Sequence, residues 1–467
     1  MVRGDGFGLG LHRVGAVRFA DFFAKWQRVV AWWRNAGRSE RLAAGLFFWA
    51  TALVWAQPLP GGPRLPFFLL LGFAMGAWWH ARGDLWRPPA AKGTAGSLLV
   101  FALVLVLSVI GAPQPAIGWS YALGMSGFGV ASAALVWAAR RLPRPSFWLG
   151  WGVRAGFLFL LGDAWLQWLV GRDLFGVPYR ASYFEGRLLG PFADTLKLPV
   201  LLALLFPVAV WPWRDRMRVA LPLLLATGWV VLLSGARSAL VLLMLAALPV
   251  VWRWPRRVRV GLLGVVVLGV FAAVVVSPAW QKRIENSVDG FVALRQAKES
   301  AATEEGLNRI LSQRWGLWRN ATRMGAANPF FGVGTKQFRY VYADYADEGD
   351  PYLHADPYHA HHLYLALWAE LGGAGLLWFF VIAGSMFVAF RRASPEARAR
   401  AAPWAAALAA YAFPVQSQPV LLNVWWFPVI WLCWIAFWVA LTESDRAEQS
   451  QQNGQGEPPI VSESLFR

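Results

Sequence analysis

The chain has 467 residues, of which 57% are hydrophobic and only 15% are charged, and its net charge at pH 7 is +18. Soluble globular domains average about 45–50% apolar residues, so the composition excludes an ordinary soluble protein. In a soluble protein the excess positive charge would suggest nucleic acid. Here the basic residues flank apolar segments, where they act as topology signals, and we expect no nucleic-acid partner.

Residues 1–41 precede the first long apolar segment and contain a candidate surface helix. Aromatic and aliphatic residues recur there at helical spacing, with basic residues between them: Phe19, Phe22, Phe23, Trp26, Val30 and Trp33, and Arg18, Lys25 and Arg28. A basic amphipathic helix of this kind binds the surface of an anionic leaflet. We therefore predict an interfacial helix in this N-terminal segment, on the cytoplasmic side.

The apolar segments that follow are roughly 16–25 residues long, which suits a bilayer core about 30 Å thick. Backbone groups in that core must pair within helices or a closed barrel, and these runs are too long and too continuous for barrel strands. We predict an all-α polytopic membrane protein with about 12 transmembrane helices, nine within residues 42–277 and three within 363–442. The predicted spans are 42–56, 65–80, 97–112, 117–139, 146–171, 196–213, 219–234, 236–252, 260–277, 363–390, 402–414 and 424–442.

The loops between these spans alternate in charge. The short loops on one side hold seventeen Lys and Arg residues, and those on the other side hold five. The positive-inside rule makes the first side cytoplasmic, so both termini are predicted inside and residues 278–362 form one large outer loop. The tail, residues 443–467, is polar and rich in Gln and Gly and is predicted to be disordered in the cytoplasm.

Four of the six histidines crowd the end of the large loop: His354, His359, His361 and His362. Three interpretations are open, namely a metal site completed by Asp356, a structural role, and a general base. An imidazole has a pKa near 6.5 and can take a proton from a hydroxyl at neutral pH. His361 is the best candidate, because on a helix it would share one face with Tyr364 and Leu365.

Three arginines on the outer side are not explained as topology signals. Arg187 precedes the sixth span, Arg237 lies in "SGARS" between the seventh and eighth spans, and Arg314 lies in the large loop. A charge placed like Arg237 is costly unless it faces a cavity or a ligand, although a snorkelling or structural arginine is the alternative. Guanidinium groups match phosphate oxygens, so the three together suggest an anion such as a pyrophosphate carried on a lipid.

Two other features are weaker. The acidic stretch from Asp344 to Asp350 could bind a cation, but a solvated loop is the favoured interpretation. The single cysteine, Cys433, cannot form an intrachain disulfide and excludes a Cys-based metal site.

Four elements in this order resemble the signatures of the O-antigen ligase/polymerase superfamily. Their similarity covers roughly residues 183–390, and the first half of the chain is similar only in hydropathy. His362 departs from the family pattern, which has Asn at that position. The four elements are Arg187-Leu188-Leu189-Gly190-Pro191-Phe192, Ser234-Gly235-Ala236-Arg237-Ser238, Arg314…Trp318…Asn328-Pro329-Phe330-Phe331-Gly332-Val333-Gly334, and Ala360-His361-His362-Leu363-Tyr364-Leu365 followed by Glu370-Leu371-Gly372-Gly373-Ala374-Gly375.

The resemblance implies a GT-C-like fold and glycosyl transfer from an undecaprenyl pyrophosphate-linked glycan at the periplasmic face of the bacterial inner membrane. It implies no cofactor, no nucleotide sugar and no required metal. Twelve spans with one large loop after the ninth look most like the ligase, whose acceptor is lipid A–core. Carried onto this chain, the resemblance makes His361 the catalytic base and assigns the pyrophosphate to Arg187, Arg237 and Arg314. Possible supporting residues are Tyr364, His362, Lys197 and Glu370.

Other functions stay open at this point. An O-antigen polymerase or a protein O-oligosaccharyltransferase would use the same donor with another acceptor, which the motifs do not distinguish. A transporter or flippase for the same lipid is the alternative from another class, but transporters usually place their binding groups near the bilayer midplane. The sequence does not determine the sugar specificity or the oligomeric state.

Overall fold

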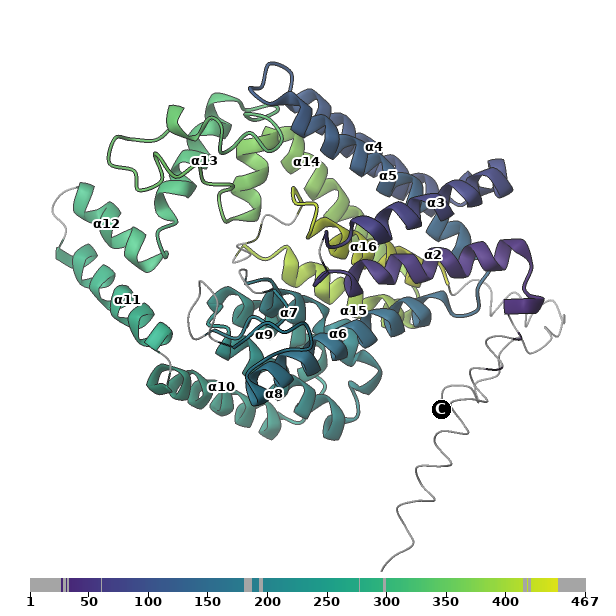
Figure 1. Ribbon diagram of the computed structural model, residues 1–467, viewed down its shortest axis with the longest axis horizontal. Helices are drawn as coiled ribbons and strands as arrows, with labels where there is room; N and C mark the ends of the chain where they lie inside the picture. The colour runs from purple at the N-terminus through teal and green to yellow at the C-terminus, as the bar shows by residue number, and fades with distance from the viewer. Residues whose placement is uncertain are drawn as a thin grey trace, which may run out of the picture.

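A computed structural model of the chain describes residues 27, 31, 33–59, 61–179, 187–192, 196–276, 278–296, 300–414, 418 and 421–443. Two predictions fall almost wholly outside these residues: the interfacial helix near the N-terminus and the disordered tail 443–467. The described residues form mainly helices, joined by turns and loops (Figure 1).

Each of the twelve predicted apolar spans overlaps a helix. They are α2 (Arg38–Trp55), α3 (Arg64–Ala81), α4 (Pro89–Ser108), α5 (Pro115–Ala139), α6 (Pro145–Val170), α7 (Lys197–Val210) with η2 (Trp211–Trp213), α8 (Met217–Leu233), α9 (Arg237–Val251), α10 (Arg256–Val276), α14 (Leu363–Arg392), α15 (Pro395–Tyr411) and α16 (Phe427–Thr442). Two of these helices, α4 and α15, begin eight and seven residues before their predicted spans. A short 3-10 helix, η1 (Arg82–Trp86), joins α3 to α4.

Membrane-spanning character is clearest for a subset of these helices. Within the described residues, α4, α5, α6 and α14 are long and apolar enough to cross a membrane, and α7, α8, α9 and α16 are shorter apolar helices. The chain is therefore an all-α membrane protein. The count of twelve spans stays a prediction.

The starts of several helices follow from local sequence. A proline stands in the first turn of α4, α5, α6, α15 and α16, where its missing N–H removes no helical hydrogen bond. The boundary between the seventh and eighth predicted spans is a turn. Gly235 adopts a φ of +66° there, a conformation that favours glycine, and so α8 ends and α9 begins at Arg237.

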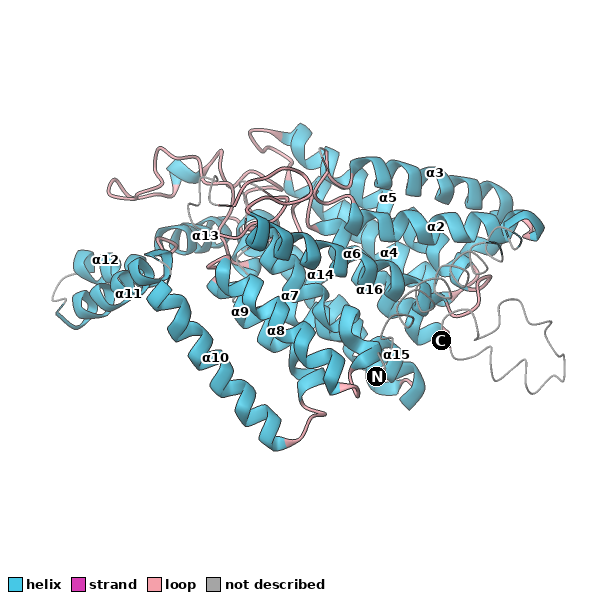
Figure 2. Ribbon diagram, turned by 60° about the horizontal axis from the view of Figure 1, so that its bottom comes forward, coloured by secondary structure: helices cyan, strands magenta, loops and turns pink. Residues whose placement is uncertain are grey.

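The described part of the large loop is helical mainly in its first half. It contains α11 (Pro278–Gln296), α12 (Ser300–Ile310), α13 (Trp315–Ala327) and η3 (Tyr342–Asp344). Figure 2 shows these elements and the long loops gathered at one end of the helical bundle, to which α10 leads. A small apolar core of its own holds this part to α14: Leu317, Ala321, Met324, Phe338, Tyr342, Ala360 and Ala369.

A kink in α14 joins this outer part to the bundle. Gly372 has φ 60° and ψ −153°, a region that is almost exclusive to glycine. The kink frees backbone groups that pair with the loop 328–334. Val333 and Gly334 donate their N–H groups to the carbonyls of Ala369 and Glu370 at 2.8 and 3.1 Å. In return, Gly373 and Ala374 donate to Pro329 and Phe330 at 2.7 and 3.0 Å.

This docking explains the glycines of both motifs. A Cβ atom on Gly332 would lie 2.5 Å from the carbonyl oxygen of Ala369, and one on Gly372 would lie 2.6 Å from the backbone of Phe330. The two segments can approach this closely only because both positions lack a side chain. The loop 328–334 is thus a fixed element that positions the residues following it.

Candidate active site

The histidine segment is not helical up to its last residue. His362 is the N-cap of α14, with extended backbone angles, and its Nδ1 accepts a hydrogen bond from the Leu365 N–H at 3.3 Å. An N-cap lies just outside the helix, so His361 cannot share a helix face with Tyr364 and Leu365. That prediction is wrong. His361 instead has a φ of +52°, a left-handed conformation that is uncommon for a non-glycine residue.

His361 packs against His359, a contact that the sequence analysis did not foresee. Their ring centroids are 4.0 Å apart, and the His361 backbone N–H donates to Nδ1 of His359 at 3.1 Å. Burial lowers the pKa of His359 well below 6.5, and the charges of His361, Lys336 and Arg314 lower it further. His359 is therefore neutral at neutral pH, and Lys336 and Arg314 lie within electrostatic range of it.

The hydrogen bond also fixes the tautomer of His359. Since Nδ1 accepts a hydrogen bond, the proton of the neutral ring sits on Nε2. His359 is then a hydrogen-bond donor at Nε2 rather than a base. His361 is therefore the candidate base. His359 positions it by accepting the hydrogen bond from its backbone N–H.

Arg237 and Arg314 form a cationic pair at the same end of the bundle. Arg237 begins α9 and reaches the large loop, where its guanidinium donates to Ser287 of α11 at 3.4 Å and to Ser312. Arg314 precedes α13 and is half-buried. Burial lowers the pKa of Arg314, and the charge of Arg237 lowers it further, so the two guanidinium groups lie within electrostatic range of each other.

No carboxylate in the described part of the chain forms a salt bridge with either Arg237 or Arg314. Two neighbouring, partly desolvated positive charges disfavour each other, and an anion placed between them would relieve that cost. Ser312 and Gln313, just before Arg314, have φ values of +55° and +63°. Backbone held in such conformations commonly marks functional sites.

Arg187 lies near Arg237 because its segment is hydrogen-bonded to the end of α8. Its neighbour Leu188 donates its N–H to the carbonyl of Leu233, the last residue of α8, at 3.2 Å. Gln167 fixes the rest of this segment by accepting from the Gly190 N–H at 2.8 Å and donating to the Gly190 carbonyl at 3.3 Å. Arg187 is therefore held beside the turn that leads into Arg237. Burial lowers its pKa.

The four possible supporting residues have structural contacts. His362 caps α14, as described above. Tyr364 donates its hydroxyl to the carbonyl of Ala412 at 2.5 Å, which ties α14 to the end of α15. Lys197 places its ammonium group 4.5 Å from the ring centroid of Trp425. Glu370 is buried and accepts the Lys336 N–H at 2.5 Å.

Lys336 is a site residue that sequence reasoning missed. It follows the docked loop 328–334, and its charge contributes to the low pKa of His359. The only local signal was its place two residues after Gly334. Its proximity to the histidines arises from the docking of that loop onto α14, which no sequence pattern reveals.

The acidic stretch is engaged with neighbouring basic and polar groups. Asp347 pairs with Arg319 at 2.7 Å and with Arg323 at 2.9 Å. Asp350 is buried and accepts hydrogen bonds from Asn320 at 2.9 Å and from the Tyr342 hydroxyl at 3.0 Å. Among the described residues, no group of three or more His, Cys, Asp or Glu side chains could hold a metal ion.

Comparison with known families adds one finding. A family model described as O-antigen ligase matches residues 200–380, and this match confirms the resemblance seen in the motifs. The matched stretch begins in α7 and ends in α14, so it includes Arg237, Arg314 and the histidine pair, whereas Arg187 lies before it. No curated protein matches the chain.

Proposed function

We propose, from the premise that this membrane protein carries a domain of the O-antigen ligase family over residues 200–380, that it transfers O-antigen polysaccharide from undecaprenyl pyrophosphate to a sugar hydroxyl of lipid A–core. The active site would face the periplasm from the inner membrane. One observation carries the proposal: the cationic pair Arg237–Arg314 lies close to the histidine pair, within the matched domain.

The arginines would bind the pyrophosphate. Guanidinium groups offer forked donors that fit phosphate oxygens and stay charged at any relevant pH. As the bond between the anomeric carbon and the pyrophosphate oxygen breaks, its electron pair moves to that oxygen. Arg237 and Arg314, with Arg187 beside them, would stabilise this developing charge. Fixed positive groups of this kind could replace a divalent metal ion.

His361 would activate the acceptor. It takes the proton from the attacking sugar hydroxyl while the oxygen bonds to the anomeric carbon, and a single displacement inverts the configuration there. His359 would hold His361 in place through its backbone contact. The left-handed conformation of His361 keeps its side chain at the end of α14 instead of on the helix.

Two alternatives share the donor, namely O-antigen polymerase and protein O-oligosaccharyltransferase, and they differ only in the acceptor. A lipid transporter is less well supported, because Arg314 and the histidine pair lie in the large loop, outside the predicted spans; α11, α12 and α13 of this loop lie at one end of the bundle (Figure 2). Transporters usually bind their substrates near the bilayer midplane.

The test is a transfer assay with purified protein in nanodiscs, with lipid-linked O-antigen as donor, run once with EDTA and once with an added divalent ion in place of EDTA. Lipid A–core, a second lipid-linked glycan and an acceptor peptide are supplied in separate reactions. Capped lipid A–core supports the proposal, whereas elongated glycan or glycosylated peptide would reassign the acceptor. Movement of the lipid across the bilayer without transfer would favour the transporter, and activity that requires an added divalent ion would contradict the arginine clamp.

Two arginine variants distinguish loss of the proposed clamp from loss of a positive charge at the surface. Arg314→Ala removes a half-buried guanidinium of the proposed clamp. Arg309→Ala removes an exposed one, five residues earlier, that pairs with Glu305 on the same helix. Exposed pairs of this kind contribute little to stability. Loss of transfer in the first variant with wild-type transfer in the second is the expected result.

A further inference from the structure

The first helix of the large loop, α11, is amphipathic. Exposed polar side chains stand on one side of it, at Glu285, Asn286 and Asp289. On another side, apolar residues recur every three or four positions and form an apolar stripe along the helix. These residues are between 43% and 64% exposed: Ile284, Val288, Phe291 and Val292. An exposed stripe of this kind is typical of a surface that contacts a protein or a membrane.

A third side of α11 is occupied by the rest of the protein. Trp280 is buried, and its indole N–H donates to a carbonyl at the end of α8 at 3.2 Å. Ser287 accepts a hydrogen bond from the guanidinium of Arg237 at 3.4 Å. A Cβ on Gly290 would lie 2.8 Å from the carbonyl oxygen of Gly306 in α12. These contacts fix how α11 is turned about its axis, so the apolar stripe faces a different side from α12 and Arg237.

The helix before it, α10, places the start of α11 at the boundary of the bilayer. α10 has 21 residues, about the 20 that a transmembrane helix needs. Arginines fill its first turn and its last turn is apolar, so it begins at the predicted cytoplasmic boundary and ends at the opposite one. α11 begins at Pro278, two residues after α10 ends at Val276. Figure 1 shows that α11 turns away from the direction of α10.

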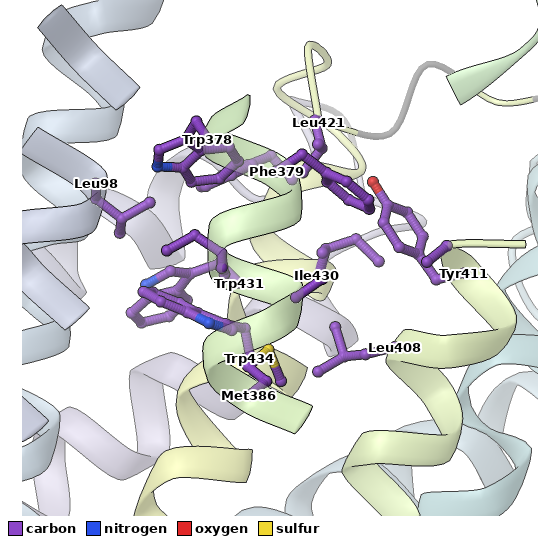
Figure 3. Close-up of a pocket in the computed structure, with 14 residues that line it drawn as sticks. Leu98, Trp378, Phe379, Met386, Leu408, Tyr411, Leu421, Ile430, Trp431 and Trp434 are labelled. Carbon is purple, nitrogen blue, oxygen red and sulfur yellow. The ribbon is translucent and has the colours of Figure 1, made fainter. Parts of the chain in front are cut away.

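The surface of α10 indicates what surrounds α11. Between helices of the bundle, apolar side chains converge, as Trp378, Trp431 and Trp434 do around the pocket between α4, α14, α15 and α16 (Figure 3). Apolar side chains of α10 remain exposed instead, and in a membrane protein such a surface contacts lipid. They are Leu263, Val267, Leu268, Phe271 and Val275. The apolar stripe of α11 follows this surface along the chain.

The charges of α11 favour the head-group region over the hydrocarbon core. Its polar side carries Glu285 and Asp289, which need water, whereas an amphipathic helix in the interface keeps one side wet and the other in lipid. Arg295 is exposed and continues the stripe one turn beyond Phe291, where its stem can lie on lipid with its head in water. A leaflet would cover the stripe and α10 together, which favours lipid over a second copy of the chain.

We infer that α11 lies in the interface of the periplasmic leaflet, with its apolar stripe in the lipid, and that the leaflet thereby holds Ser287 against Arg237. The second half of this inference rests on the proposed function, in which Arg237 binds the pyrophosphate. Ser287 is a positioning residue there, because it accepts a hydrogen bond from the guanidinium that binds the donor. A change of the stripe should then act on the donor through Arg237.

The first experiment measures the depth of α11 with nitroxide labels on single cysteines in the full-length protein, reconstituted in liposomes of phosphatidylethanolamine and phosphatidylglycerol. Ile284→Cys and Phe291→Cys report on the stripe, Glu285→Cys and Asp289→Cys are the controls, and Cys433→Ala removes the native thiol. Power saturation should show that stripe labels collide with oxygen, which concentrates in lipid, and that control labels collide with a water-soluble nickel chelate. Equal access of the chelate to all four labels would overturn the inference, as would spin–spin broadening from a second copy at the stripe.

The second experiment measures binding of the lipid-linked donor. Val288→Glu places a carboxylate in the stripe, and Asn286→Glu, its matched control, places the same charge on the polar side. The first should weaken donor binding roughly tenfold, the effect of losing one hydrogen bond to a charged group, with kcat retained at saturating donor; the second should bind like the wild type. Ser287→Ala should match Val288→Glu, and Ser287→Thr, which keeps the hydroxyl, should recover most of the affinity.

Equal donor affinity in all these variants would overturn the link from the leaflet to Arg237. The nitroxide measurement needs no transfer, so its outcome is independent of the proposed function. Lipid contact at the stripe in a protein that transfers no glycan would refute the proposed function and leave the placement of α11 standing.

Discussion

Replacing Gly372 with alanine tests whether the docked loop holds the outer part of the protein to the bundle. Alanine at φ 60° and ψ −153° costs about 1–3 kcal/mol in backbone strain. The new Cβ would also lie 2.6 Å from the backbone of Phe330, so the loop must move. Loss of two of its four backbone hydrogen bonds would cost a further 1–3 kcal/mol or so. We expect a total loss of about 4 kcal/mol.

The assay is thermal unfolding of purified protein in detergent, beside the transfer reaction. Gly372→Ala should lower the midpoint by roughly 4 °C for a chain of this length and reduce transfer, because the loop positions Lys336 beside the histidines. Gly384→Ala is the control on the same helix, since a Cβ there meets nothing within 4 Å; it should be neutral or slightly stabilising. If Gly372→Ala melts together with the wild type and Gly384→Ala, the docking argument is refuted.

Four further predictions concern the site and its orientation. His361→Ala should retain donor binding and lose transfer by about 10²–10⁴-fold, measured as capped lipid A–core on a gel beside a donor-binding assay; normal capping would remove the base assignment. Arg237→Ala should weaken donor binding, and Arg237→Lys should restore it only in part, because lysine keeps the charge but loses the fork; equal affinity in all three proteins would contradict the clamp. Burial and nearby positive charges lower the pKa of His359, so its contribution to stability is fully present above about pH 6.5 and is lost as the pH falls below that value, by up to about 1.4 kcal/mol per pH unit. His359→Gln should therefore show a flatter dependence of melting temperature on pH between about 6.5 and 5, and an unchanged slope would show that the ring is not held neutral. Glu304→Cys should react with an impermeant thiol reagent in intact cells, over a low background because Cys433 is buried; reaction only after the inner membrane is opened would reverse the predicted topology.

Part of the site could be read from the sequence because its signals are local. Arg237 stood out as a charge between two apolar runs, and the structure places it at a turn that Gly235 makes possible. The last two motifs contain glycines, which tolerate close backbone approach, and Gly332 and Gly372 meet at a contact with no room for a Cβ. In each case the residue type alone restricts what its position can be.

The helical position of His361 was wrong because a histidine took the place of a usual N-cap residue. Ser, Thr, Asp and Asn are the residues that usually mark a helix start. His is not one of them, although Nδ1 of His362 accepts a backbone N–H as an N-cap side chain does. The predicted span 363–390 begins where α14 begins, but without a start signal the helical periodicity was carried back to His361. The sequence analysis named only His361 as the candidate base, yet His359 contacts His361 directly.

The sequence by itself determined that this is a membrane protein of apolar helices and which family its central part resembles, because run length, charge flanks and glycine-bearing motifs are properties of contiguous residues. Only the tertiary structure decided that Lys336 lies near His359, that Arg319 and Arg323 pair with Asp347 of the acidic stretch, and that Tyr364 bonds to the end of α15. Each of these depends on two or more segments far apart in the chain meeting at close range. Burial and charge at such a contact are set by both partners together, so neither segment encodes the result alone.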